Sequence, residues 1–259
     1  MTPYEKFKSE GSAEIAALGD DAHIGALTRQ WVSAVNAKKY SYHFEWMGRP
    51  IIQYPQDIVA MQELIWEIKP DVVIETGIAH GGSLIMSASM LALLDVSEAI
   101  EMGKTFDPAK SARRVIGVDI DIRSHNRDAI ERHPMASRIR MIQGSSVDPA
   151  TVDQVKKAAD GAKTVLVFLD SMHTHDHVLK ELEAYAPLVS VGSYCVVFDT
   201  VIEDLPAGAF NDRPWDIGNN PKTAVHAWIA KNSNFEINRE IQNKLLITVA
   251  PDGFLKRIK

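Results

Sequence analysis

The sequence predicts an α/β fold with a mostly parallel central sheet, helices on both faces of the sheet, and a helical cap at the N-terminus. Three observations support this prediction. Short apolar runs recur from residue 68 onward, most of these runs end in an acidic or small polar residue, and stretches of helical character separate them. This alternation is typical of βαβ units, in which crossover helices connect parallel strands.

The strands and helices can be assigned in chain order. The expected strands are "DVVIETG", "RVIGVDID", "RIRMIQGSS", "KTVLVFLDS" and "GSYCVVFDT". The expected helices are "GGSLIMSASMLALLDV" and residues 124–133, 150–159 and 177–188. The later segments "FEINREI" and "KLLITVAPDGFLKRI" are expected to form a strand pair at the edge of the sheet.

The N-terminal residues differ from the rest of the chain. Residues 1–66 are more helical and include the aromatic-rich stretch "YSYHFEWMGRPIIQYP". We interpret them as a cap packed on the main domain, which covers residues 67–259. A chain of 259 residues is long for one domain, but an α/β domain with appendages reaches this size.

The composition narrows the classes of protein to which this chain could belong. The net charge of −6 and the lack of a basic block argue against nucleic acid as a partner. Cys195 is the only cysteine, which excludes an intrachain disulfide and favours a reducing compartment. No signal peptide is visible, and the apolar stretch from Leu84 to Val96 is too short to span a bilayer. The sequence therefore predicts a cytoplasmic protein without a membrane span.

The stretch "ETGIAHGGSL" is the first candidate site. In an open parallel sheet, ligands bind outside the carboxyl ends of the strands, and this stretch follows such an end. Glu75 closes the strand, and Gly77, Gly81 and Gly82 lead into a helix whose first N–H groups are free donors. The spacing matches neither GxGxxG nor GxxxxGK[ST], so a plain glycine-rich turn remains the alternative.

Two further strand ends favour a nucleoside site. Asp119 is placed to accept hydrogen bonds from a ribose diol, and Asp121 competes for that role. Either acid alone is more simply explained as a solvated strand end, but the glycine loop favours the nucleoside interpretation. The stretch "QGSS", which contains Ser145, is placed either to line an adenine edge or to form a turn.

The stretch "VFLDSMHTHDH" is the densest cluster of ionisable residues. Asp170 ends the fourth strand and Asp199 the fifth, and neighbouring strands lie about 5 Å apart, so the two carboxylates could share one hard cation. His173 follows Asp170 by three residues, which favours a functional role. His173 and His177 have the i, i+4 spacing of a zinc site, but the acidic surroundings and the lack of cysteine argue against zinc. His175 and His177 are better explained as polar residues at a helix start.

Four stretches together resemble a known family. "ETGIAHGGSL", "VIGVDIDIR", "LDSMHTHDHVLKELEAYAPLVSVGSYCVVFDT" and "KLLITVAPDGFLKR" are similar to the cephalosporin hydroxylase family, which includes rhamnosyl and other sugar O-methyltransferases. The resemblance runs from about Trp46 to the C-terminus. It implies the Rossmann-like class I methyltransferase fold, S-adenosylmethionine as cofactor, a divalent metal that is usually Mg²⁺, and a homo-oligomer.

The resemblance also implies roles for single residues. The implied cofactor-binding residues are Glu75, Gly77, Gly81, Ser83, Asp119, Ser145 and Asp170, with Asp119 on the ribose. The implied metal ligands are Asp170 and the acids that end the fifth strand. In the family a Glu-Asp pair is common there, whereas here Phe198 precedes Asp199, so one ligand is missing. Thr200, Glu203 and Asp204 are the candidates to replace it.

The predicted chemistry is metal-assisted methylation of a sugar hydroxyl in a nucleotide sugar, a glycolipid or a secondary-metabolite glycoside. A cation on Asp170 and Asp199 would lower the pKa of the acceptor hydroxyl, and His173 suits a general base. Two alternatives stay open: a hydroxylase, although no clear His₂-carboxylate spacing appears, and a non-catalytic nucleoside-binding partner.

The residues that would contact the acceptor are harder to assign. Aromatic rings beside polar groups suit a sugar, and arginine suits a phosphate. The same residues suit a subunit interface equally well. The candidates are Arg49, Tyr54, Trp215 and Asn219.

Overall fold

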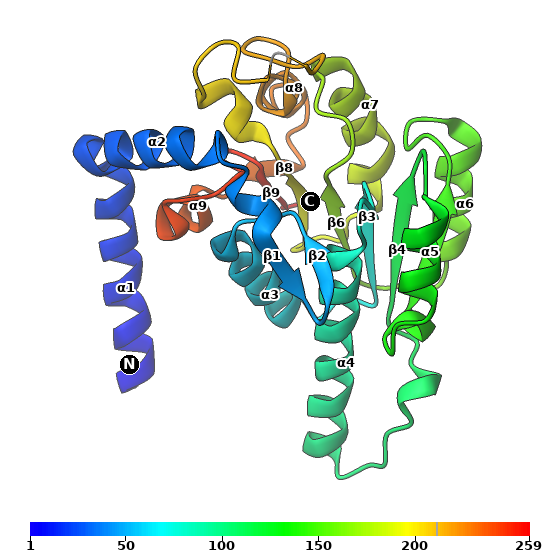
Figure 1. The fold of residues 1–259 in the computed structure, drawn as a ribbon. Coiled ribbons are helices and arrows are strands. Elements are labelled where there is room, and N and C mark those ends of the chain that lie inside the picture. The colour runs from blue at the N-terminus through cyan, green and yellow to red at the C-terminus, as the bar shows by residue number, and fades with distance from the viewer. Residues whose placement is uncertain (211) are drawn as a thin grey trace.

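A seven-stranded sheet forms the centre of the protein in the computed structural model, which describes residues 1–210 and 212–259 (Figure 1). The strand order is β5–β4–β3–β6–β7–β9–β8. The strands are β3 Val72–Thr76, β4 Arg114–Asp119, β5 Ile139–Gln143, β6 Val165–Leu169, β7 Tyr194–Val197, β8 Phe235–Ile237 and β9 Phe254–Arg257. Neighbouring strands from β5 to β7 are parallel, and β9 is antiparallel to β7 and β8. The predicted mostly parallel sheet is confirmed.

Helices cover both faces of the sheet, as expected. They are α3 Pro55–Ile68, α4 Gly82–Met102, α5 Ser124–Glu131, α6 Pro149–Ala159, α7 His175–Tyr185 and α8 Pro221–Ile229. Successive strand residues point to opposite faces. Accordingly Val73 packs in one apolar cluster with Leu84 of α4, and Ile74 packs in a second cluster with Leu182 of α7.

The edge of the sheet differs in part from the expectation. β8 and β9 form the expected antiparallel pair, but "FEINREI" leaves the strand at Ile237. Asn238 then caps α9, Arg239–Leu245, because its side chain accepts a hydrogen bond from the amide of Glu240 at 3.1 Å. In "KLLITVAPDGFLKRI" only Phe254–Arg257 is a strand, since the first residues of that segment finish α9.

Several expected helix boundaries also shift. The helix expected at 177–188 begins two residues earlier and ends at Tyr185, where a 3₁₀ turn over Ala186–Leu188 follows. Helix α4 continues beyond the apolar stretch to Met102, which makes it 21 residues long. Among the described residues it is the one helix whose length and composition would allow it to cross a membrane. Its first half is buried against the sheet, as in the core helix of a globular domain.

The N-terminal residues form two helices and a hairpin. These are α1 Pro3–Asp20, α2 Ala22–Asn36, β1 Phe44–Trp46 and β2 Arg49–Ile51. Helix α1 lies at the periphery against α9, and α2 leads back toward the sheet (Figure 1). The boundary expected at residue 66 falls inside α3, and the division into cap and main domain stays a prediction.

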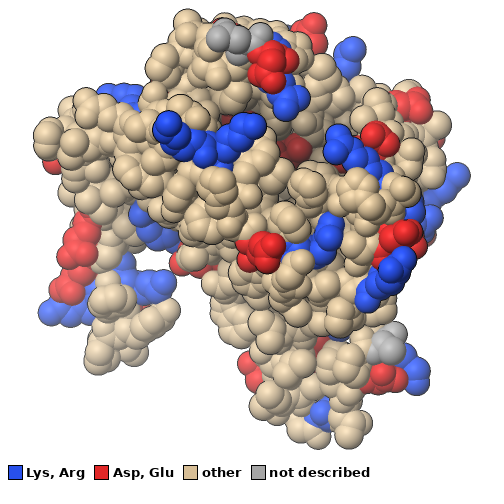
Figure 2. Space-filling model, viewed as in Figure 1, with Lys and Arg blue, Asp and Glu red and all other residues tan. Residues whose placement is uncertain are grey.

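The surface carries charges of both signs. On the face shown in Figure 2, Lys and Arg side chains are interspersed with Asp and Glu over a largely uncharged surface. This distribution agrees with the modest net charge of −6.

Candidate active site

A cavity of about 350 Å³ lies at the carboxyl ends of β3, β6 and β7. The loop after each of these strands contributes to its lining. The cavity is closed by N-terminal residues, among them Asn36 and Gln53, and by Phe210, Arg213 and Trp215. The cavity is therefore at the edge of the sheet where the sequence predicts a ligand. A larger cavity of 540 Å³ between α1 and the body contains none of the predicted site residues.

The glycine loop after β3 brings two strand ends into contact. Gly77 has a φ of +89°, and a Cβ there would lie 2.0 Å from the carbonyl oxygen of Asp170, so a side chain is excluded. Gly81, with a φ of +83°, is the N-cap of α4. The backbone of the loop therefore requires glycine at these two positions. The same loop presents Gly77 and Ser83 to the cavity.

Glu75 is a buried acid with an incomplete set of partners. Its side chain is 2% exposed, and one carboxylate oxygen accepts a hydrogen bond from the hydroxyl of Ser83. The other oxygen has no partner among the described residues. Burial, with a smaller contribution from the charge of Asp170, raises the pKa of Glu75 to about 8. Because an unpaired buried acceptor is costly, this oxygen fits a ligand that brings an N–H or ammonium donor.

The structure distinguishes the two acids after β4. One oxygen of Asp119 accepts hydrogen bonds from the amides of Ile78 at 2.8 Å and Ala79 at 3.3 Å, so this side chain shapes the glycine loop. The side chain of Asp121 is 72% exposed and lies 3.9 Å from Arg123. Asp119 is therefore the acid that contacts the glycine loop, although it does not line the cavity, and its contact with a ribose stays a prediction.

The turn after β5 is ordered by hydrogen bonds. The carbonyl of Ser145 accepts from the amide of Asp148 at 3.0 Å. The hydroxyl of the next residue, Ser146, lies 3.0 Å from Nε2 of His177. His177 is thus part of a polar contact behind the site, beyond its role as a polar residue at a helix start.

Asp170, His173 and Asp199 form the cluster that the sequence predicts. One ligand atom from each residue lies within 4.8 Å of the others, and Nε2 of His173 is 3.0 Å from Oδ2 of Asp199. The amide of Gln53 donates to Asp170 at 3.0 Å. Two carboxylates and an imidazole are suitable ligands for a divalent cation, and oxygen ligands favour Mg²⁺.

The charges of this cluster are unbalanced. Burial and the neighbouring carboxylate of Asp199 raise the pKa of Asp170 to about 8. For His173, burial acts to lower the pKa, but the charges of Asp199 and Asp170 outweigh it and the pKa is raised. A cation between the carboxylates would remove the repulsion that raises the pKa of Asp170, so the donor set fits a metal.

The candidates to replace the missing ligand have other partners. The hydroxyl of Thr200 donates to the carbonyl of Pro251 at 2.7 Å. Glu203 accepts from the amide of Gly218 at 2.8 Å, and Asp204 pairs with Lys222 at 2.7 Å. The group of potential ligands that the described residues bring together is Asp170, His173 and Asp199.

Of the acceptor candidates, Trp215 lines the cavity. Its ring meets that of His173 edge to face with centroids 4.7 Å apart. Arg49 donates to the carbonyl of His80 at 2.6 Å and so supports the glycine loop. Tyr54 is 1% exposed within an aromatic cluster, and Asn219 bonds to the amide of His175 at 3.0 Å.

Several cavity residues were not predicted. Gln53 is 3% exposed, its amide nitrogen bonds to Asp170, and its amide oxygen has no partner among the described residues. A polar residue inside the otherwise apolar stretch "IIQYP" is the signal that could have identified it. The other unpredicted lining residues include Asn36, Ser41 and Phe210.

Asp57 supports the site from behind. It is 1% exposed, and its carboxylate accepts from the hydroxyl of Thr248 and from the amide of Val249 at 3.0 Å. The carbonyl of Val249 in turn accepts from the amide of Val201, two residues after Asp199, at 3.1 Å. Burial raises the pKa of Asp57 to about 7. The segment that holds the Asp199 loop therefore depends on a buried acid.

Comparison with known proteins identifies the family. The model of the Rhamnosyl O-methyltransferase/CmcI family matches residues 38–258. The chain belongs to this family. A rhamnosyl O-methyltransferase of Mycobacterium tuberculosis (strain ATCC 25618 / H37Rv) is 30% identical over 218 residues, which cover 82% of this chain and 77% of the relative. The enzyme of the same name from Mycobacterium leprae (strain TN) is 28% identical over 215 residues, 82% of each chain.

Solved structures show the same fold. The apo form of CmcI superposes with a TM-score of 0.55 at 17% identity and covers 84% of this chain and 77% of that chain. A CmcI structure with Mg and SAM also has a TM-score of 0.55, at 18% identity, over 84% of this chain and 78% of that one. The fold is that of S-adenosylmethionine-dependent methyltransferases, and with the family it identifies the chain as an O-methyltransferase of this class.

Proposed function

We propose that the protein transfers the methyl group of S-adenosylmethionine to a sugar hydroxyl with the help of Mg²⁺. The observation that carries this proposal is the position of the Asp170–His173–Asp199 cluster, in the same cavity as the glycine loop after β3. The names of the relatives, rhamnosyl O-methyltransferases, favour a deoxyhexose glycoside as acceptor.

The cofactor is assigned to the glycine loop. The unpaired oxygen of Glu75 is available to accept a hydrogen bond from the ammonium group of the cofactor's amino-acid part. As the family resemblance implies, we assign Asp119 to the ribose diol and Ser145 to the adenine. Gly77 is required in this loop because the backbone of Asp170 occupies the position that a Cβ would take. When bound, the cofactor supplies an electrophilic methyl group.

The metal is assigned to Asp170 and Asp199. When bound, Mg²⁺ supplies positive charge that lowers the pKa of the acceptor hydroxyl. His173 takes the proton from that hydroxyl, and Asp199, 3.0 Å from its Nε2, stabilises the imidazolium that results. Trp215 packs against the imidazole and limits its rotation. The cluster has one histidine rather than the two of a non-haem iron facial triad, which argues against the hydroxylase alternative.

The variant His173→Ala tests the base. A general base contributes about 10²–10⁴-fold, so we expect turnover to fall at least about tenfold. Binding of S-adenosylhomocysteine, measured by calorimetry, should stay near that of the wild type. Unchanged turnover would remove His173 from the mechanism, whereas lost cofactor binding would mean that it shapes the pocket. The cytoplasmic location and the homo-oligomer remain predictions from the sequence.

A further inference from the structure

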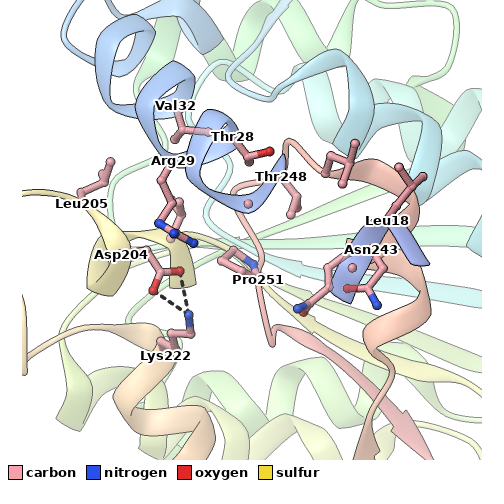
Figure 3. A pocket seen from close by; sticks show the side chains of 15 residues that line it. Leu18, Thr28, Arg29, Val32, Asp204, Leu205, Lys222, Asn243, Thr248 and Pro251 are labelled. Carbon is pink, nitrogen blue, oxygen red and sulfur yellow. Dashed lines mark hydrogen bonds and ion pairs between the residues drawn. The ribbon is translucent and has the colours of Figure 1, made fainter. Parts of the chain in front are cut away.

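Another cavity, of about 290 Å³, shares Val201 with the active-site cavity. We call the active-site cavity the first and this one the second, which Figure 3 shows. Its lining comes from α1 and α2 on one side, and from α9 and the segments that contain Asp204 and Thr248 on the other. Apolar side chains form much of the wall, among them Leu18, Val32 and Leu205. Polar side chains, among them Thr28, Asn243 and Thr248, share the wall with them. Apolar walls combined with placed polar groups are typical of a small-molecule site.

The charges of this cavity are not balanced. Its charged lining residues in the described part of the chain are Arg29, Lys222 and Asp204. Lys222 and Asp204 neutralise each other through two hydrogen bonds of 2.9 and 2.7 Å. Arg29 has no hydrogen bond or ion pair with any described residue, and its guanidinium points from α2 toward the Asp204–Lys222 pair (Figure 3). The cavity therefore keeps one unpaired positive charge, which suits a carboxylate or phosphate.

The two cavities share lining elements. Val201 lines both of them, directly after the loop that carries Asp199. Helix α2 also serves both, because Arg29 and Val32 line the second cavity and Asn36 lines the first. Arg29 and Asn36 are separated by two helical turns, which is about 10 Å along the axis. The two cavities are therefore neighbours, and an elongated molecule that passed Val201 would reach both.

The size of the first cavity favours such an extension. Pockets for one drug-sized ligand measure about 300–1,000 Å³. At about 350 Å³, the first cavity has room for little beyond the reacting parts of cofactor and sugar. A larger group attached to the sugar would extend beyond this cavity, and the neighbouring cavity, which Val201 also lines, is available to it.

We propose that the second cavity binds the part of the acceptor beyond the sugar, and that this part has an apolar neck and an anionic group for Arg29. The proposal rests on the sugar-methylating function proposed above and adds the chemical class of the aglycone. It makes Arg29 a residue that determines specificity, outside the machinery of methyl transfer.

The test measures binding and needs no turnover. Protein loaded with S-adenosylhomocysteine and Mg²⁺ is titrated by calorimetry with ω-carboxyalkyl rhamnosides of increasing spacer length and with alkyl rhamnosides of the same lengths. At the spacer that reaches Arg29, we expect the carboxylate to bind about fivefold tighter than its neutral partner, the upper range for an exposed ion pair. Arg29→Ala should abolish this preference, and Arg29→Lys should retain most of it. Arg140→Ala, which removes an exposed arginine of the edge strand β5, should leave it unchanged.

The outcomes separate this inference from the proposed function. Equal affinity for the charged and neutral rhamnosides, a preference that survives in Arg29→Ala, or no binding of any rhamnoside would overturn the inference. Methylation of the neutral rhamnosides is measured separately in the wild type. Methylation of the rhamnosides without a preference for the charged ones would support the proposed function and contradict the anionic aglycone. Binding that depends on Arg29 without any methylation would support the anionic aglycone site and contradict the proposed function.

Discussion

Two groups of acids differ sharply in how the protein compensates their charge. Near the C-terminal half of α4, Asp95 receives hydrogen bonds from Arg113 at 2.5 Å, Arg138 at 2.6 Å and Ser111 at 2.5 Å. Burial alone would raise the pKa of Asp95, but these three donors together lower it. Asp170, in contrast, receives one neutral amide and faces Asp199, and its pKa rises to about 8.

The difference separates a structural network from a binding site. Arginines that fully compensate an acid leave nothing for a ligand to add, so the Asp95 network stabilises the fold. Acids left in mutual repulsion are costly in the free protein and gain stability when a cation arrives. The comparison therefore predicts opposite effects for matched substitutions at the two places.

The largest effect is expected on activity, from Asp170→Asn. The variant keeps the shape of the side chain but removes a metal ligand, and turnover should fall by about a hundredfold or more. Without metal, its free energy of unfolding should equal or exceed that of the wild type, because a repelled buried charge is gone. Kinetics and urea unfolding measure the two quantities, with exposed Asp176→Asn as the control. A clear loss of stability in the metal-free variant would contradict the comparison.

Asp95→Asn should have the opposite profile. The substitution leaves Arg113 and Arg138 without their shared anion, and we expect a loss of about 3 kcal/mol in the free energy of unfolding. Turnover per folded molecule should stay unchanged, since the network lies away from the cavity. Urea unfolding with Glu98→Gln as a less buried reference checks the size of the effect. Equal losses of unfolding free energy in Asp95→Asn and Glu98→Gln would show that the burial of Asp95 does not increase its contribution to stability.

The pH dependence of stability should also differ between the acids of the Asp95 network and those of the active site. The pKa of Asp170 rises on folding from 3.8 to about 8, so the folded metal-free protein binds more protons than the unfolded chain in this range. Its free energy of unfolding should then fall as pH rises from about 4 to about 8, and Glu75 acts in the same direction. The lowered pKa of Asp95 contributes stability that is lost only as pH falls below its usual range.

Thermal unfolding with and without Mg²⁺ checks this dependence. Because protons compete with the cation, Mg²⁺ should raise the unfolding temperature more near pH 8 than near pH 5. Asp170→Asn should reduce that difference. The same Mg²⁺ shift at both pH values would mean that the cation binds away from Asp170.

The smallest effect is expected behind the site, from Thr248→Val. Asp57 would lose one of its two donors while the amide of Val249 remains, at a cost of about 1 kcal/mol. The Asp199 loop, which Val249 holds through Val201, should then bind Mn²⁺ severalfold more weakly in a paramagnetic titration. Thr248→Ser keeps the hydroxyl and should behave as the wild type. Unchanged Mn²⁺ affinity in Thr248→Val would limit Asp57 to a role in stability.

The sequence predicts the sheet well because every central strand is a continuous apolar run. Asp170 and Asp199 could be predicted to meet because parallel neighbours end at the same edge of the sheet, and His173 follows by local spacing. The structure confirms that these three residues come together. In contrast, the strand in "FEINREI" is cut short by the cap at Asn238, whose effect competes with an equally good strand pattern.

Contacts between distant segments explain what the sequence does not predict. Gln53 meets Asp170 across 117 positions, and no local pattern relates them. Arg49 and Asn219 look like free polar residues in the sequence, but their donors and acceptors are used by His80 and His175. Thr200 is a similar case, because its hydroxyl donates to the carbonyl of Pro251.

Calorimetric titration with S-adenosylhomocysteine, in the presence and absence of Mg²⁺, tests the central claim most directly. The account predicts one-to-one micromolar binding of S-adenosylhomocysteine, and a separate Mg²⁺ isotherm that disappears in Asp170→Asn. An absence of cofactor binding would contradict the assignment of the glycine loop. A Mg²⁺ isotherm that persists in Asp170→Asn would contradict the assignment of the cation to the acids after β6 and β7.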